Sequence, residues 1–222
     1  MIAQEKSNSF DWGTVLIWGF ATAMGLVISD GFQAYFVQPN SLLSFFIPGI
    51  AIGVLQWIYF NFSKFKNAGI WIWATVFGWA LSWFIGSFFG SVTNLLIGAI
   101  NGTLTEGDVI NVSSTPFGLP VQVIAHGTFL GIIQWGFFMR KRFNSAAWWI
   151  FATAFGWGIS IFIGWLIIPA ILQTIGWNES GLEDSVVRGV IFGLTTGLTL
   201  QWLLKRPRVI KEDMAINTDS LK

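Results

Sequence analysis

The chain contains a single histidine, His126, and it lies within a long apolar segment. It stands about eight residues, or roughly 12 Å of helix, from the outer end of that segment. Ionisable groups inside membrane-crossing segments are candidates for function. A neutral imidazole there could bond a backbone carbonyl and do nothing more, or it could relay a proton, bind a substrate or ligate the metal of a tetrapyrrole. A haem with two histidine ligands is excluded within one chain.

Other polar and aromatic side chains share the outer half of the apolar segments with His126. Asp184 and Arg188 have the i, i+4 spacing of an ordinary ion pair within one helix. A histidine beside water or a carboxylate could titrate between about pH 5 and 8. Deep indoles need an acceptor for their N–H group and could form a pocket wall. We therefore predict a ligand-binding site that opens away from the cytoplasm and contains His126, Gln122, Arg188, Asp30, Trp157 and Trp79.

Several kinds of chemistry are missing from the sequence. The chain has no cysteine, so it cannot form a disulfide, a thiolate metal site or a cysteine nucleophile. It has no phosphate-binding glycine loop, zinc-ligand spacing or paired-carboxylate hydrolase pattern. We predict that the protein is not an enzyme and has no metal site, while the identity of any cofactor stays open.

The composition is that of a membrane protein. Of 222 residues, 54% are hydrophobic and 10% are charged, against about 25% charged in an average soluble domain. A helix that crosses a bilayer needs about 20 mostly apolar residues. Six runs meet this length, at 12–36, 41–60, 70–100, 118–138, 147–172 and 185–204. The prediction is an all-α, polytopic membrane bundle over 12–204, with a short N-terminal segment (1–11) and a polar tail (205–222).

Charges alternate along the connections between these six spans. Short loops that carry Lys and Arg stay in the cytoplasm. The basic residues of three alternate connections are Lys64, Lys66, Arg140, Lys141, Arg142, Lys205, Arg206, Arg208 and Lys211. The acidic residues of the other connections are Asp30, Glu106, Asp108, Glu179, Glu183 and Asp184. This predicts cytoplasmic termini at both ends and a location in an inner or thylakoid-type membrane.

A nonapeptide occurs three times, as "ATAMGLVIS" at 21–29, "ATVFGWALS" at 74–82 and "ATAFGWGIS" at 152–160. Its small residues recur every four positions, which allows two helix backbones to pack closely in lipid. The intervening spans share the pattern G-x-x-x-G-x-x-Q-W around Gln56 and Gln134, and Gln201 stands in span six with its glycines one residue out of register. We predict three tandem helical hairpins, with the glutamines facing threonines such as Thr75 and Thr153.

The pattern G-x-x-x-G-x-x-Q-W, a basic turn, then W-x-x-A-T-x-F-G-W resembles that of Trp-rich multi-pass membrane proteins of cyanobacteria and other bacteria. The resemblance covers nearly the whole chain, although Leu26 stands where the other spans have the paired Trp. It implies a multi-pass membrane fold and carries over no activity and no site residue.

Two classes of function follow from these features. The first is a membrane protein that binds or transports a small hydrophobic or amphipathic ligand. The second is a non-transporting accessory or assembly subunit of a membrane complex, which could hold a pigment, a quinone or a lipid. An intramembrane enzyme would have to rely on His126 and a few carboxylates. The expected partners are membrane lipid and other membrane subunits, and not nucleic acid.

Overall fold

The computed structural model describes residues 10–37, 41–101, 118–174 and 182–208. Most of the predicted N-terminal segment and tail therefore lies outside the described residues, as do the predicted outer connections with Glu106, Asp108 and Glu179. The helices are α1 (Trp12–Phe36), α2 (Ile47–Phe62), α3 (Ile70–Asn101), α4 (Gly118–Phe137), α5 (Trp148–Phe162), α6 (Ile168–Thr174) and α7 (Leu182–Leu204). Short 3₁₀ turns precede α2 (Leu42–Phe45) and follow α4 (Met139–Lys141), and a π-helical segment (Ile163–Ile167) joins α5 to α6.

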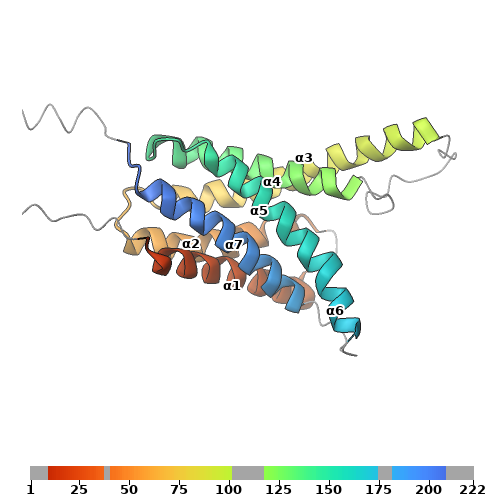
Figure 1. Ribbon diagram of the computed structural model, residues 1–222, viewed down its shortest axis with the longest axis horizontal. Helices are drawn as coiled ribbons and strands as arrows, with labels where there is room; N and C mark the ends of the chain where they lie inside the picture. Colours follow the sequence, from red (N-terminus) through yellow and green to blue (C-terminus); the bar gives the residue numbers. More distant parts are fainter. Residues whose placement is uncertain (1–9, 38–40, 102–117, 175–181, 209–222) are drawn as a thin grey trace, which may run out of the picture.

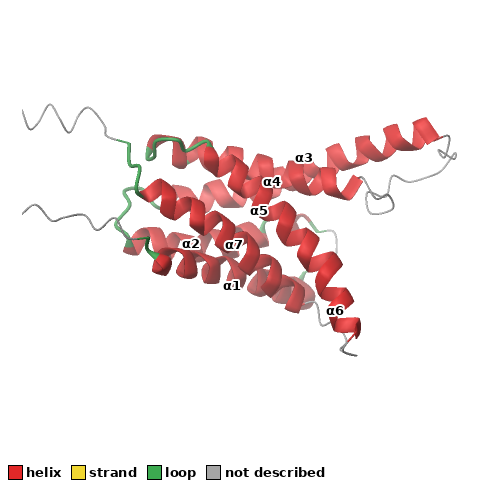
Figure 2. Cartoon of the chain, in the orientation of Figure 1, coloured by secondary structure: helices red, strands yellow, loops and turns green. Residues whose placement is uncertain are grey.

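The all-α prediction is confirmed for the described part of the chain, which contains no β-strand (Figure 2). Four segments are long and apolar enough to cross a membrane: Trp12–Phe36, Leu42–Phe62, Ile70–Asn101 and Glu183–Leu204. The predicted fifth span is divided, because α5 has 15 residues and continues through the π-helical segment into α6.

The six long helices form a closed ring. Each packs against two others, in the order α1, α2, α3, α4, α5, α7 and back to α1. The turns 63–69 and 138–147, the start of α1 and the end of α7 lie at one end of the bundle (Figure 1). We call this the basic end, after Lys64, Lys66, Arg140, Arg142 and Arg206. The opposite end is the far end.

Large apolar side chains cover the outside of the bundle, while the interior combines apolar side chains with many polar ones. Large apolar side chains are exposed on the outside, with Phe20 67%, Phe88 63% and Phe151 65% exposed. The interior contains polar groups, namely Thr14, Thr22, Ser29, Gln56, Thr75, Ser82, Asn94, His126, Gln134, Thr153, Ser160, Ser185, Thr196 and Gln201. Such a distribution suits a hydrocarbon solvent, in which polar groups face the bundle interior.

Glycines bring neighbouring backbones together at three helix pairs. A Cβ atom on Gly49 would lie 2.8 Å from the Cα of Val76, and one on Gly127 would lie 2.8 Å from the Cα of Ala154. Gly189 lies even closer against the backbone of Ala23. The pairs are α2 with α3, α4 with α5, and α7 with α1. One turn further along, the glycines at 53, 131 and 193 pack against the threonines at 75, 153 and 22.

The small residues of the nonapeptide fill the remaining interfaces. Gly25 packs against Ile52 of α2, Gly78 against Leu130 of α4, and Gly156 against Thr195 of α7. A Cβ at Gly25 would lie 2.8 Å from the Cα of Ile52, so a side chain there would force the backbones apart. The interpretation of the nonapeptide as a packing device therefore agrees with the structure.

Two glycines of α4 provide a matched test of this packing. Gly127→Ala should lower the free energy of unfolding by roughly 1 to 3 kcal/mol, because its Cβ would clash with the backbone of α5. Gly136 has no atom of another element within 4 Å of a built Cβ, so Gly136→Ala should be neutral or stabilising by up to about 1 kcal/mol. Thermal unfolding in detergent measures both, and equal effects of the two substitutions would contradict the packing account.

Candidate functional site

A buried amide, Gln56, links three helices in the middle of the bundle. Its side-chain oxygen accepts from the indole N–H of Trp71 on α3 at 3.0 Å, and its NH₂ group donates to the hydroxyl of Thr22 on α1 at 2.9 Å. Thr22 in turn donates to the Trp18 carbonyl at 2.8 Å. The amide thus uses one donor and one acceptor bond to hold α1, α2 and α3 together.

The same arrangement recurs at α4, and a shorter side chain replaces it at α7. Gln134 accepts from Trp149 at 2.9 Å and donates to Thr75 at 3.2 Å. At the third interface the acceptor of the indole N–H is Thr196, which receives the bond of Trp18 at 3.1 Å. A threonine is too short to reach onward to the next helix as the two glutamines do.

This arrangement corrects two expectations drawn from the sequence. Thr196, and not Gln201, stands three residues after the closely packed Gly193, as Gln56 stands three after Gly53. Gln201 is buried five residues further toward the basic end. The glutamines also bond to threonines of the preceding long helix, whereas the sequence analysis placed their partners on the following one.

Aromatic side chains close the bundle axis on the basic side of the amides. Trp18, Trp71 and Trp149 are buried together with Phe60 and Phe138. The Trp71 and Trp149 side chains are 0% and 1% exposed, so both indoles lie inside the bundle. The cavity at the amide layer has a volume of about 10 Å³, enough for about one water molecule. The axis is therefore not an open path.

His126 lies on α4 and enters the interior beside α3. Gly86 makes this possible, since a Cβ there would lie 2.7 Å from the Gln122 carbonyl and 3.3 Å from the His126 backbone N. The imidazole Nδ1 is 3.1 Å from Ser82 Oγ. Ser82 Oγ also lies 3.0 Å from the Trp79 carbonyl, to which its hydroxyl donates, and this favours Nδ1–H as the donor to Ser82. Nε2 is then the lone-pair nitrogen.

Three indoles surround this imidazole. The ring centroids of Trp79, Trp83 and Trp157 lie 5.1, 5.5 and 5.1 Å from that of His126. Its Nε2 is buried and has no hydrogen-bond partner among the described residues. No carboxylate contacts the ring in the part of the chain that the structure describes, since the nearby acids bind elsewhere. The structure thus brings His126, Trp79 and Trp157 together in a closed aromatic cage.

Asp30 and Arg188 form a second, separate cluster at the far end. The Arg188 guanidinium pairs with Asp184 at 2.7 Å and with Asp30 at 3.4 Å. Ser185 also donates to Asp30 in a short hydrogen bond. The simple i, i+4 pair expected from the sequence is present, and Asp30 of α1 extends it across the α1–α7 interface.

The sixth predicted site residue, Gln122, stands apart from both groups. It donates to Ser87 of α3 at 3.2 Å. No described contact joins it to the imidazole or to the ion pair. The six residues that the sequence grouped by depth therefore occupy three places, because depth along a helix does not specify the direction in which a side chain points.

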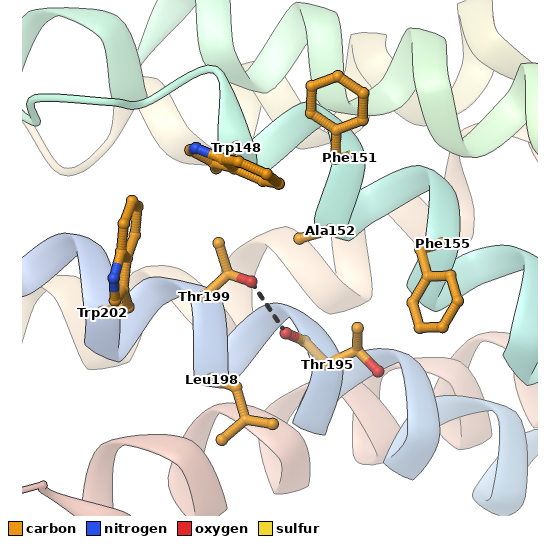
Figure 3. Close-up of a pocket in the computed structure, with 8 residues that line it drawn as sticks. All are labelled: Trp148, Phe151, Ala152, Phe155, Thr195, Leu198, Thr199 and Trp202. Atoms are coloured by element: carbon orange, nitrogen blue, oxygen red, sulfur yellow. Dashed lines mark hydrogen bonds between the residues drawn. The ribbon is translucent and has the colours of Figure 1, made fainter.

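An open groove lies between α5 and α7 toward the basic end (Figure 3). Its volume is about 530 Å³. Its walls are Trp148, Phe151, Ala152 and Phe155 of α5, and Thr195, Leu198, Thr199 and Trp202 of α7. We name it the α5–α7 groove. It opens between the apolar outer faces of two helices, so in a membrane it would open to lipid.

A similar groove of about 630 Å³ lies between α1 and α2. Ala21 lines it as Ala152 lines the first, and both alanines begin a copy of the nonapeptide. Sequence reasoning missed both grooves, since their residues read as ordinary lipid-facing positions. The available signal was the spacing of Trp148, Phe151 and Phe155 on one helical face, opposite hydroxyls on another span.

Comparison of the chain with known protein families, with curated proteins and with solved structures finds no match. The described residues thus form two polar clusters, the indole cage of His126 and the ion pairs of Arg188, and two open grooves. The two grooves are open to a ligand without rearrangement of the bundle.

The unpartnered Nε2 of His126 leads to a stability prediction. A buried acceptor without a partner costs roughly 1 to 3 kcal/mol, so His126→Phe should unfold at the same temperature as the parent or higher. His126→Leu is the steric control, because a destabilisation of His126→Phe that came from a clash would be absent with the smaller leucine. Ser82→Ala should destabilise the parent, because it leaves the Nδ1–H group of His126 unpaired. The same substitution should not destabilise His126→Phe, because phenylalanine has no N–H group.

Thermal unfolding of the two single variants and the double variant in detergent measures this coupling. A loss of more than about 2 kcal/mol in both His126→Phe and His126→Leu would contradict the prediction. It would mean that Nε2 has a partner in the protein as it exists in the membrane.

Proposed function

We propose that the chain is an integral membrane protein of six spans, built from three tandem helical hairpins with both termini in the cytoplasm. The exposed apolar side chains on every long helix support this, including Ile124 and Phe137 on α4 and Phe155 on α5. The chain is helical throughout 148–174, long enough for a fifth span. The polar interior and the basic end fit the same orientation.

The recurring glycine contacts support the division into hairpins. The tight pairs are α2 with α3 and α4 with α5, each joined by a short turn at the basic end, and α7 with α1, the two ends of the chain. In each pair one helix has two glycines four residues apart, and the second glycine packs against a threonine of the other helix. Three copies of one unit would explain why the three helix pairs make equivalent contacts although their sequences differ.

Single cysteines can test this topology, because the chain has none of its own. Ser63 and Ser145 are exposed at the basic end, and Asn101 and Thr174 are exposed at the end of α3 and of α6. An impermeant thiol reagent should label Asn101→Cys and Thr174→Cys in intact cells, and Ser63→Cys and Ser145→Cys only after the cells are opened. Labelling of Ser145→Cys from outside would reverse the proposed orientation.

For activity, we propose binding of a small hydrophobic or amphipathic ligand from the lipid phase. The observation that carries this is the α5–α7 groove, whose volume of about 530 Å³ lies within the usual range for ligand sites. Its lining combines apolar rings with the hydroxyls of Thr195 and Thr199. The closed axis favours entry from the side over passage through the bundle.

An accessory subunit is the second candidate function, and one observation favours it. The outer face of α5 presents a row of exposed aromatic rings, Trp148, Phe151, Phe155 and Phe162. A helix of a partner subunit could pack on such a row. In that case the groove would be filled by protein side chains in the native complex.

Photo-crosslinking distinguishes these proposals. A diazirine-labelled fatty acid should attach to Phe151, Phe155 or Leu198 in the purified protein in nanodiscs. Ala152→Leu fills the groove and should abolish this labelling, while Ala21→Leu, the matched change in the α1–α2 groove, should leave it unchanged.

Equal labelling around all helices, unaffected by Ala152→Leu, would overturn the binding proposal. Protection of the same residues only when the protein is isolated with a co-purifying subunit would support the accessory role instead.

A further inference from the structure

We propose that the α5–α7 groove holds an acyl chain of an anionic phospholipid whose phosphate binds Arg206. This inference rests on the proposed function, and it adds the chemical class of the ligand and the residue that selects it. The lipid would belong to the leaflet at the basic end.

Arg206 lies at the basic end of this groove. Its guanidinium carbon is 4.2 Å from the centre of the Trp202 ring, and Trp202 forms part of the groove wall. The indole nitrogens of Trp148 and Trp202 lie toward the same end of the groove (Figure 3). Cation and indole N–H groups thus meet at one mouth, where the head group of a lipid in the groove would lie.

The Arg206 side chain is exposed, and among the described residues it makes no side-chain hydrogen bond. Other arginines near it are already engaged. Arg142 donates to the carbonyls of Phe138 and Lys66 at 3.0 and 2.6 Å. Arg208 donates to the Arg140 carbonyl at 3.0 Å. Arg206 therefore has all of its guanidinium donors available for an anion, whereas Arg142 and Arg208 are held in part by backbone carbonyls.

The backbone around Arg206 is held in place. Its carbonyl accepts from the Asn144 N–H at 2.9 Å, and the Arg208 N–H donates to the Arg142 carbonyl at 2.8 Å. These bonds tie the end of α7 to the turn before α5. The cation is thus positioned on the same two elements that form the groove walls.

The chemistry of a phospholipid matches both parts of this site. A guanidinium binds phosphate oxygens through two parallel N–H bonds, and its stacking on an indole restricts its motion. The groove walls are apolar apart from two threonines. In the α1–α2 groove, Phe62 and Ser63 occupy the basic end, and no cation is recorded over Phe62 among the described ring contacts. Of these two grooves, the α5–α7 groove is the one with a cation stacked on a ring that lines it.

Native mass spectrometry of the protein in mild detergent can test this, with phosphatidylglycerol and phosphatidylcholine of identical acyl chains. The parent should bind the anionic lipid about fivefold more tightly, as expected for one basic group near a phosphate. Arg206→Gln should remove this preference, and Arg206→Lys should retain part of it. Arg140→Gln is the matched control, since it removes an equal charge from over Trp135 at the basic end.

Two results would overturn the proposal. One is equal binding of the two lipids by the parent, and the other is an equal loss of preference in Arg206→Gln and Arg140→Gln, which would reflect overall charge alone. Diazirine labelling of the groove is read in the same Arg206→Gln protein. If one of these two results is obtained and the groove is still labelled, only the head-group assignment has failed. If the groove of the parent protein is not labelled, the binding proposal itself has failed.

Discussion

Close contact between glycine backbones is the interaction on which the rest of this structure depends. In lipid, apolar side chains gain little by leaving one apolar medium for another, so dispersion at short range and buried hydrogen bonds hold helices together. Gly127 and Gly131 allow α5 to approach α4 until backbone atoms touch. Only at that separation can Trp149 reach the Gln134 amide. The packing thus sets the hydrogen bonds, and both set the ring of helices.

The same packing explains why the open spaces lie on the outside. The glycine-lined pairs leave no room between their helices, and the axis is filled by Trp18, Trp71 and Trp149. The α5–α7 and α1–α2 pairs leave grooves of about 530 and 630 Å³ between the outer faces of their helices. A ligand of this protein is therefore expected to approach sideways, from the bilayer.

The departures from threefold regularity are chemically informative. Thr196 accepts the indole N–H bond as each glutamine does, but within the described part of the chain it makes no onward bond to a third helix. Toward the far end, His126 stands four residues before the buried Leu130 of α4, and Arg188 stands four residues before the buried Phe192 of α7. One is caged by indoles and the other is paired with carboxylates. Helices α4 and α7 thus carry different polar groups at corresponding positions.

The sequence by itself determined that the chain requires an apolar environment, that it is helical, and which small residues bring helices together. Composition requires an apolar environment, and four-residue spacing of small residues predicts close helix contacts, because helical periodicity fixes which residues share a face. The sequence also singled out His126, Trp79 and Trp157, which do meet.

Tertiary structure alone decided which helix each face meets. It paired Gln134 with Thr75 and assigned Thr196 the place expected for Gln201. It separated His126 from Arg188 and created the α5–α7 groove from residues about 50 positions apart. The reason is physical: periodicity specifies a direction around one helix axis, whereas a site depends on the rotation and separation of two or more axes, which many weak contacts fix together.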